Sequence, residues 1–110
     1  MAAQKAMRLD PQRRDYALVE GGAYVLMGRY EEAIPPLKRF LARYSNIVGA
    51  HLLLIACYVE LGRNEEARAE AAELLRINPQ FSLAVEKQRS PLKEPLRDRF
   101  YADMAKAGLK

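Results

Sequence analysis

Apolar residues recur at helical spacing in successive segments of the chain, and short polar or glycine-containing stretches separate these segments. The first clear stripe lies over residues 15–27 and the second over residues 31–43. The third segment, residues 48–61, is apolar on almost every face, which is typical of a helix that lies between neighbours. The first stripe consists of Tyr16, Val19, Ala23 and Leu26, and the second of Ile34, Leu37, Phe40 and Leu41.

The pattern continues more weakly toward the C-terminus. Residues 65–77 are rich in alanine, which favours a helix. Residues 81–89 predict a short helix, and Pro91 and Pro95 predict a loop before an amphipathic helix over residues 96–107, which Gly108 ends. The side chains expected to point inward in residues 65–77 are Ala67, Ala71, Leu74 and Leu75. In the last helix, Leu96, Phe100 and Met104 lie on one side, which Tyr101 can extend.

Two of the breaks between helices have five residues in common at the same positions. A stretch with Gly28, Arg29, two glutamates and Ala33 returns 34 residues later with the same five residues in the same places. The glycines predict left-handed residues that end a helix. The glutamates, Glu31 and Glu32 and their equivalents, predict acidic charge in the first turn of the next helix, where it suits the helix dipole.

A second set of breaks keeps the same period: Asp10-Pro11, Tyr44-Ser45 and Asn78-Pro79. With the glycine turns, these positions resemble the tetratricopeptide repeat, a 34-residue pair of helices. The second copy supplies His51, Leu54, Tyr58, Gly62, Ala67, Ala71, Leu74 and Pro79 at the positions of the repeat pattern, and the first supplies Ala17, Tyr24, Gly28, Ala33, Leu37, Phe40 and Ser45.

The resemblance implies an all-α fold, a right-handed solenoid of helix–turn–helix pairs. We expect two full repeats over residues 13–46 and 47–80, and a degenerate capping pair of helices over residues 81–110. Residues 1–12 match the end of a repeat, with a helix over residues 2–9. They are either the end of a preceding repeat in a longer protein, which we favour, or an N-terminal capping helix.

Two prolines interrupt the pattern of the first repeat. If its second helix begins at residue 31, Pro35 and Pro36 lie just beyond the first turn and remove two backbone donors. We therefore expect a local kink or a tightened first turn at this place.

The tail carries a narrower resemblance. The run from Asn78 to Leu83, a proline-bearing loop and an ending at Lys106-Ala107-Gly108-Leu109 resemble the repeat region of bacterial adenylate/guanylate cyclase-like regulators. The resemblance implies that a cyclase domain lies outside this chain and that this region regulates signalling by docking or dimerisation. Related arrays follow DNA-binding domains, so the region of a transcription regulator is the alternative.

Charge and cysteine content narrow the classes of partner. The net charge of +4 is interleaved with acidic residues, so nucleic acid is an unlikely partner. If nucleic acid does bind, the basic ends would carry it. No apolar run approaches the length of a membrane span. Cys57, the only cysteine, favours a reducing, cytoplasmic compartment. The basic residues at the two ends are Arg13, Arg14, Arg89, Lys93, Arg97 and Arg99.

The residues needed for catalysis or metal binding are absent from the sequence pattern. His51 is the only histidine and stands where the repeat has a packing residue, and no phosphate-binding loop or metal-ligand spacing occurs. We therefore expect no enzyme, no metal and no cofactor in this region. What remains is binding, by the concave groove that the first helix of each repeat lines. The groove residues are expected to be Leu18, Gly22, Val25, Leu52, Ala56 and Val59.

An apolar groove of this kind suits an amphipathic helix of a partner protein. The alternatives are that the last helix of this chain fills it, or that a second copy does so in a homodimer. Leu18 and Gly22 stand where related repeats that grip chaperone C-termini have lysine and asparagine, so the resemblance implies no carboxylate clamp.

Overall fold

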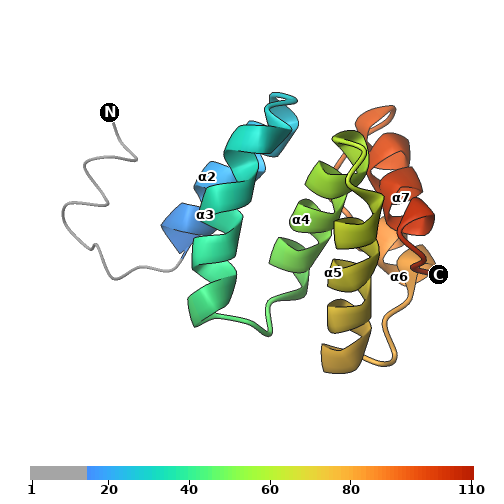
Figure 1. Cartoon of the computed structure of the whole chain (residues 1–110). Coiled ribbons are helices and arrows are strands. Elements are labelled where there is room, and N and C mark those ends of the chain that lie inside the picture. Colours follow the sequence, from blue (N-terminus) through green and yellow to red (C-terminus); the bar gives the residue numbers. More distant parts are fainter. Residues whose placement is uncertain (1–14) are drawn as a thin grey trace.

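The structure, a computed structural model, describes residues 15–110 and consists there of six α-helices without strands. Figure 1 shows the helices standing side by side as three pairs, with the second pair between the other two. The all-α fold expected from the sequence is therefore confirmed. The helices are α2 (Asp15–Leu26), α3 (Tyr30–Arg43), α4 (Val48–Glu60), α5 (Asn64–Ile77), α6 (Leu83–Arg89) and α7 (Leu96–Lys106).

The two glycine turns have the same conformation. Gly28 and Gly62 have φ values of 76° and 77°, which are left-handed as the sequence predicts. In each turn the following arginine donates its backbone N–H to the carbonyl of a tyrosine five residues earlier, at 2.8 Å from Arg29 and 2.7 Å from Arg63. The acidic residues lie in the first turns of α3 and α5, so they mark helix starts as expected.

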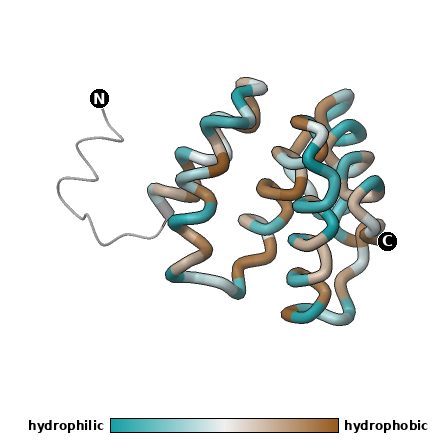
Figure 2. The backbone as a smooth tube through the Cα atoms, in the orientation of Figure 1, coloured by the Kyte–Doolittle hydropathy of each residue, from teal (hydrophilic) through white to brown (hydrophobic). Residues whose placement is uncertain are grey.

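Helix α4 is the centre of the core. It packs against α3 and α5 along their lengths and also against α2 and α7. Leu54, Ile55 and Cys57 are buried almost completely, and Figure 2 shows the apolar residues gathered along this helix. Its even apolar composition therefore matches its position between neighbours, as the sequence indicated.

The prediction for the two prolines is wrong. Helix α3 continues in α-helical conformation from Tyr30 to Arg43 with Pro35 and Pro36 inside it. Pro36 is buried together with Ile34 and Leu37. We attribute the continuity to this apolar packing, because it offsets the loss of two backbone hydrogen bonds. The prediction that Leu75 points inward is also wrong, since 38% of it is exposed on α5.

The third pair of helices does not continue the repeat. A regular third pair would place α6 against the preceding helices, but α6 packs mainly on α7, and α7 packs on α4. The backbone N–H of Leu83 donates to the carbonyl of Lys110 at 2.8 Å, so the chain end lies beside the start of α6. Gly108, with a φ of 101°, follows the end of α7 as predicted.

Some predictions fall outside the described residues. The helix over residues 2–9 and the partial repeat over residues 1–12 are among them. The boundaries of the expected repeats, at residues 13, 47 and 81, stay predictions. The helices themselves begin and end within two residues of the expected positions.

Candidate functional site

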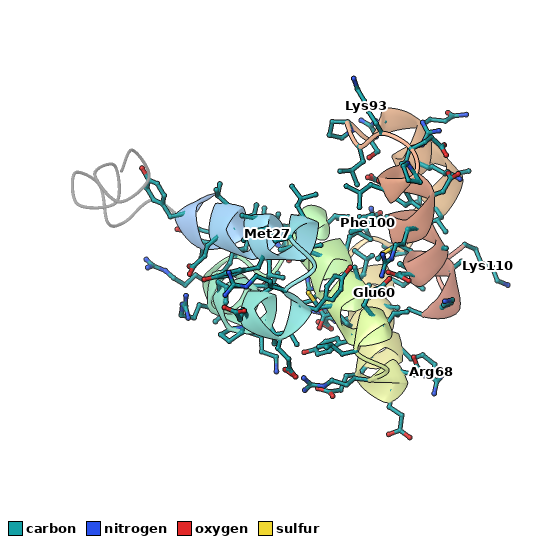
Figure 3. All side chains as sticks on the ribbon, turned by 90° about the horizontal axis from the view of Figure 1, so that it is seen from above. Met27, Glu60, Arg68, Lys93, Phe100 and Lys110 are labelled. Carbon is teal, nitrogen blue, oxygen red and sulfur yellow. The ribbon has the colours of Figure 1, made fainter. Side chains whose placement is uncertain are left out.

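An open apolar groove of about 390 Å³ lies between the first helices of the two repeats and the C-terminal pair. Helices α2 and α4 supply one side, and α6, α7 and the loop between them supply the other. In Figure 3, Met27 marks the α2 side of α4 and Phe100 marks the α7 side. We call this feature the interhelical groove; its lining is Leu18, Gly22, Val25, Leu26, Gly49, Leu52, Leu53, Glu86, Arg89, Ser90, Pro91, Leu92, Leu96, Phe100 and Tyr101.

Four of the six residues expected in a concave groove line it together: Leu18, Gly22, Val25 and Leu52. The other two, Ala56 and Val59, do not. Ala56 belongs to the buried core, and Val59 packs partly buried against it. The C-terminal end of α4 is the part that α7 reaches, because Arg99 of α7 binds Glu60 next to Val59. The last helix of the chain therefore packs at the end of α4 that contains Val59, while Leu18, Gly22, Val25 and Leu52 still line an open groove.

Sequence reasoning missed the second wall of the groove. Leu92, Leu96, Phe100 and Tyr101 supply apolar lining from the C-terminal pair. The apolar stripe of the last helix was a usable signal, since it contains three of these four residues. The stripe did not show which side of α4 the helix would cover, because the third pair departs from the repeat geometry.

Glycine keeps the groove open on the repeat side. A Cβ atom on Gly49 would have no other atom within 4 Å, and one on Gly22 would make only ordinary contact with Leu53 at 3.8 Å. A methyl group could therefore be added at either position without collision. Larger residues here would occupy the space that a ligand could use.

Polar contacts hold the wall formed by α7 against α4. Arg99 binds both carboxylate oxygens of Glu60, with nitrogen–oxygen distances of 2.6 and 3.1 Å. This arginine, together with hydrogen bonding to Asp103, lowers the pKa of Glu60. Burial of Asp103, and then its hydrogen bond to Glu60, raise the pKa of the Asp103 carboxyl. As the pH falls, Asp103 therefore takes up a proton first, while Glu60 stays ionised beside the Arg99 guanidinium.

His51 has a structural position, as its place in the repeat indicated. Its Nδ1 contacts Glu70 of α5 and its Nε2 lies 2.7 Å from the carbonyl of Ser45. Burial disfavours the charged imidazole, but Glu70 and the Ser45 carbonyl outweigh it and raise the pKa of His51. The ring is buried between α4, α5 and the preceding turn, so it does not face the groove.

The Cys57 thiol is also placed in the core, away from the groove. Cys57 is fully buried, and this burial raises the pKa of its thiol to about 12, so it holds little thiolate at neutral pH. Among the residues that the structure describes, no cluster of His, Cys, Asp and Glu could hold a metal ion. No helix within residues 15–110 is long and apolar enough to cross a membrane.

The basic residues proposed for nucleic acid do not form one free patch. Arg97 pairs with Glu94, and Arg99 pairs with Glu60. Arg89 lines the interhelical groove instead of an open basic surface. Arg13 and Arg14 lie outside the described residues. Half of the expected cations that the structure describes are therefore neutralised by acidic partners.

A family model for the tetratricopeptide repeat matches residues 24–87, which is more than half of the chain. The chain belongs to the tetratricopeptide repeat family. The match runs from α2 into α6, so it covers both glycine turns and the whole of α4. A comparison with curated proteins gives no match. Membership of this family indicates a scaffold for protein–protein interaction and gives no sign of catalysis.

Proposed function

We propose that this repeat protein binds the apolar face of an amphipathic helix from a partner protein in its interhelical groove. The observation that carries the proposal is the lining, which is apolar except for Glu86, Arg89 and Ser90 on the α6 side. An apolar groove of this shape matches the mode in which a helix presents residues at i, i+3, i+4 and i+7. The polar residues at one edge would then orient the partner helix.

The walls of the groove favour a ligand that presents apolar side chains. A peptide that binds by adding a strand needs the edge of a sheet, and residues 15–110 contain no strand, so this mode of binding is excluded there. Leu26 and Leu96, on opposite walls, are 60% and 38% exposed, so large apolar side chains stand uncovered at the mouth. A partner helix would bury both.

The experiment is a selection from a displayed library of amphipathic helical peptides, followed by affinity measurement with a groove-filling variant. Gly49→Leu places a side chain in the open groove and replaces glycine within a helix, so the thermal midpoint should rise while binding is lost by at least tenfold. A matched control, Ala72→Leu on the exposed side of α5, should leave binding unchanged. Selected peptides that bind Gly49→Leu as tightly as the parent chain would contradict the proposal.

The setting of this module is a second part of the proposal. We infer a regulatory region of a larger cyclase-like signalling protein in the cytoplasm, and the support is the resemblance of the tail. Phe81 and Leu109 of that tail are buried, so a structural role in the fold also accounts for them. An antibody raised against the chain tests the setting in the source cells. On a denaturing gel of cell extract, a band far larger than 12.5 kDa would agree with this setting, and a band near 12.5 kDa would contradict it.

A further inference from the structure

Helix α7 carries a carboxyl group into its contact with α4. Asp103 is 4% exposed, and it is the only acidic residue among the buried residues of the described chain. Met104 and Ala107 of the same helix are buried beside it in the sequence. An acidic side chain at such a place must be paired or must carry a proton, because burial disfavours its charged form.

The partner of Asp103 is itself an acid. The Asp103 carboxyl has a side-chain hydrogen bond with Glu60, the last residue of α4. Glu60 already accepts from Arg99 through both of its oxygens, at 2.6 and 3.1 Å. Two ionised carboxylates are both acceptors and cannot bond each other, so one of them must hold a proton. Arg99 keeps Glu60 ionised, and the proton therefore lies on Asp103.

Other titratable groups face this carboxyl pair from α7 and α3. Arg99 and Lys106 of α7 favour the ionised form of Asp103, so they offset part of the repulsion between the two carboxylates. Tyr30 of α3 faces the same cluster, and burial raises the pKa of its hydroxyl above the ordinary value of 10.0, so it stays neutral near pH 7. The two cations do not balance the burial of Asp103 and the charge of Glu60.

The charged residues of α6, the other helix that packs on α7, lie away from this pair. Lys87 binds Asp98 of α7 at 3.0 Å, and Glu86 and Arg89 line the interhelical groove. The protonation of Asp103 is thus governed by the end of α4 and by α7 itself.

We propose that the proton between Asp103 and Glu60 makes the packing of α7 on α4 dependent on pH, with the tighter contact below neutral pH. When Asp103 ionises, repulsion from Glu60 replaces the hydrogen bond. The buried apolar residues of α7 keep the helix on α4, so the contact weakens without being released. Phe100 and Tyr101 of α7 line the interhelical groove, so this wall is held most firmly at acidic pH. The proposal does not depend on what the groove binds.

The direction and the size of the effect follow from proton linkage. Burial, and then the hydrogen bond to Glu60, raise the pKa of Asp103 from an ordinary value of 3.8 to about 7. The stabilisation by the protonated form is therefore complete below about pH 4 and is lost as the pH rises through about 7. Glu60, whose pKa is lowered to about 2, stays ionised over this range. The equilibrium between packed and detached α7 should shift about tenfold toward the detached form between pH 6 and pH 8.

Hydrogen–deuterium exchange of the whole chain at pH 6, 7 and 8 tests the proposal. After correction for the intrinsic exchange rate of each amide at each pH, the protection of the α7 amides should fall about tenfold from pH 6 to pH 8. Helix α3, which packs on α2 and α4, is the internal reference and should change much less. An equal fall in α3 and α7 would place the effect on the whole fold and overturn the proposal.

Two matched substitutions on α7 assign the effect to one carboxyl. Asp103→Asn supplies a side-chain donor to Glu60 at every pH, so the protection of α7 should stay at the value of the parent chain at pH 6. Asp98→Asn makes the same change at an exposed carboxyl and should keep the tenfold fall. An Asp103→Asn variant with the pH dependence of the parent chain overturns the proposal.

Carbon-13 NMR of the side-chain carboxyls in the parent chain gives a measurement that does not require any variant to fold. The Asp103 carboxyl should titrate near pH 7, while the Glu60 carboxyl should stay ionised down to about pH 4. Titration of Asp103 near its ordinary value of 3.8 would show that it holds no proton at neutral pH, and the proposal would then be wrong.

Discussion

Helices α2 and α4 occupy equivalent places in the two repeats, and both are almost free of charged residues. Their surroundings differ. Helix α4 is enclosed by α3, α5 and α7, and eight of its residues are buried, whereas α2 has α3 and part of α4 beside it. The apolar composition of a repeat helix thus does not by itself show how much of the helix is covered. Within residues 15–110, α2 leaves Val19 and Leu26 60% exposed, whereas the described neighbours of α4 cover most of that helix.

The polar contacts of the two helices differ in the same way. Helix α4 is tied to α5 by His51 and to α7 by Glu60. The equivalent of His51 in α2 is Ala17, which offers no hydrogen bond from its side chain. Helix α2 is joined to α3 by the exposed pair of Glu20 and Arg39, at 3.4 Å, and Gly21 allows α3 to approach closely.

The largest expected effect separates the two helices by core packing. Leu54→Ala on α4 removes a fully buried side chain and should lower the free energy of unfolding by about 2–5 kcal/mol. Val19→Ala on α2 changes an exposed side chain and should alter it by less than about 0.5 kcal/mol. Urea denaturation at low micromolar concentration measures both. A loss from Val19→Ala as large as that from Leu54→Ala would contradict the exposed position of Val19.

The next effect tests the close approach at α2. A Cβ atom on Gly21 would lie 2.5 Å from Cγ and Cδ2 of the fully buried Leu37. Gly21→Ala should therefore destabilise the chain by about 1–3 kcal/mol through overpacking. Gly22→Ala, one residue further, meets no such obstacle and should stabilise by about 0.5–1 kcal/mol through helix propensity. Thermal denaturation of the two variants measures these changes in stability. Equal effects of the two substitutions would contradict the close packing of Gly21 against Leu37.

Much of the fold follows from local sequence. Gly28 and Gly62 fix the two turns because glycine alone adopts their backbone conformation without strain, and the 34-residue period then places the helices. The kink predicted at Pro35 and Pro36 is absent from α3. The prediction considered only the two lost hydrogen bonds, because the sequence does not show that Pro36 is buried. Leu75 was misplaced because nothing in the sequence shows that α6 leaves the outer side of α5 open.

The groove was predictable only as far as the repeat extends. Leu18, Gly22, Val25 and Leu52 follow from the geometry of the repeat and line the groove together. Ala56 and Val59 do not line it, and the wall that includes Phe100 could not be placed, because the packing of α7 on α4 is a long-range contact outside the repeat pattern. The apolar residues Val19 and Leu26 of α2 were visible in the sequence, but their pattern did not show that both would be 60% exposed within residues 15–110.

The smallest effect concerns the contact between His51 of α4 and Glu70 of α5, which Ala17, the equivalent residue of α2, cannot make. The pKa of His51 is raised in the folded chain, so the charged ring stabilises the fold fully below its unfolded pKa of about 6.5. This stabilisation is lost as the pH rises through the higher folded pKa. His51→Gln should thus lower the free energy of unfolding by about 1 kcal/mol at pH 6, and the difference from the parent chain should shrink by pH 9.

Chains that differ only at residue 51 must be compared at each pH, because Asp103 also titrates at a raised pKa and changes stability in both. Glu70→Gln supplies the partner control: it removes the carboxylate that holds the imidazolium and should flatten the same pH dependence. If the penalty of His51→Gln is the same at pH 6 and pH 9, the ring acts as a neutral packing residue. Residue 51 of α4 would then contribute by packing alone, as Ala17 does at the equivalent position of α2.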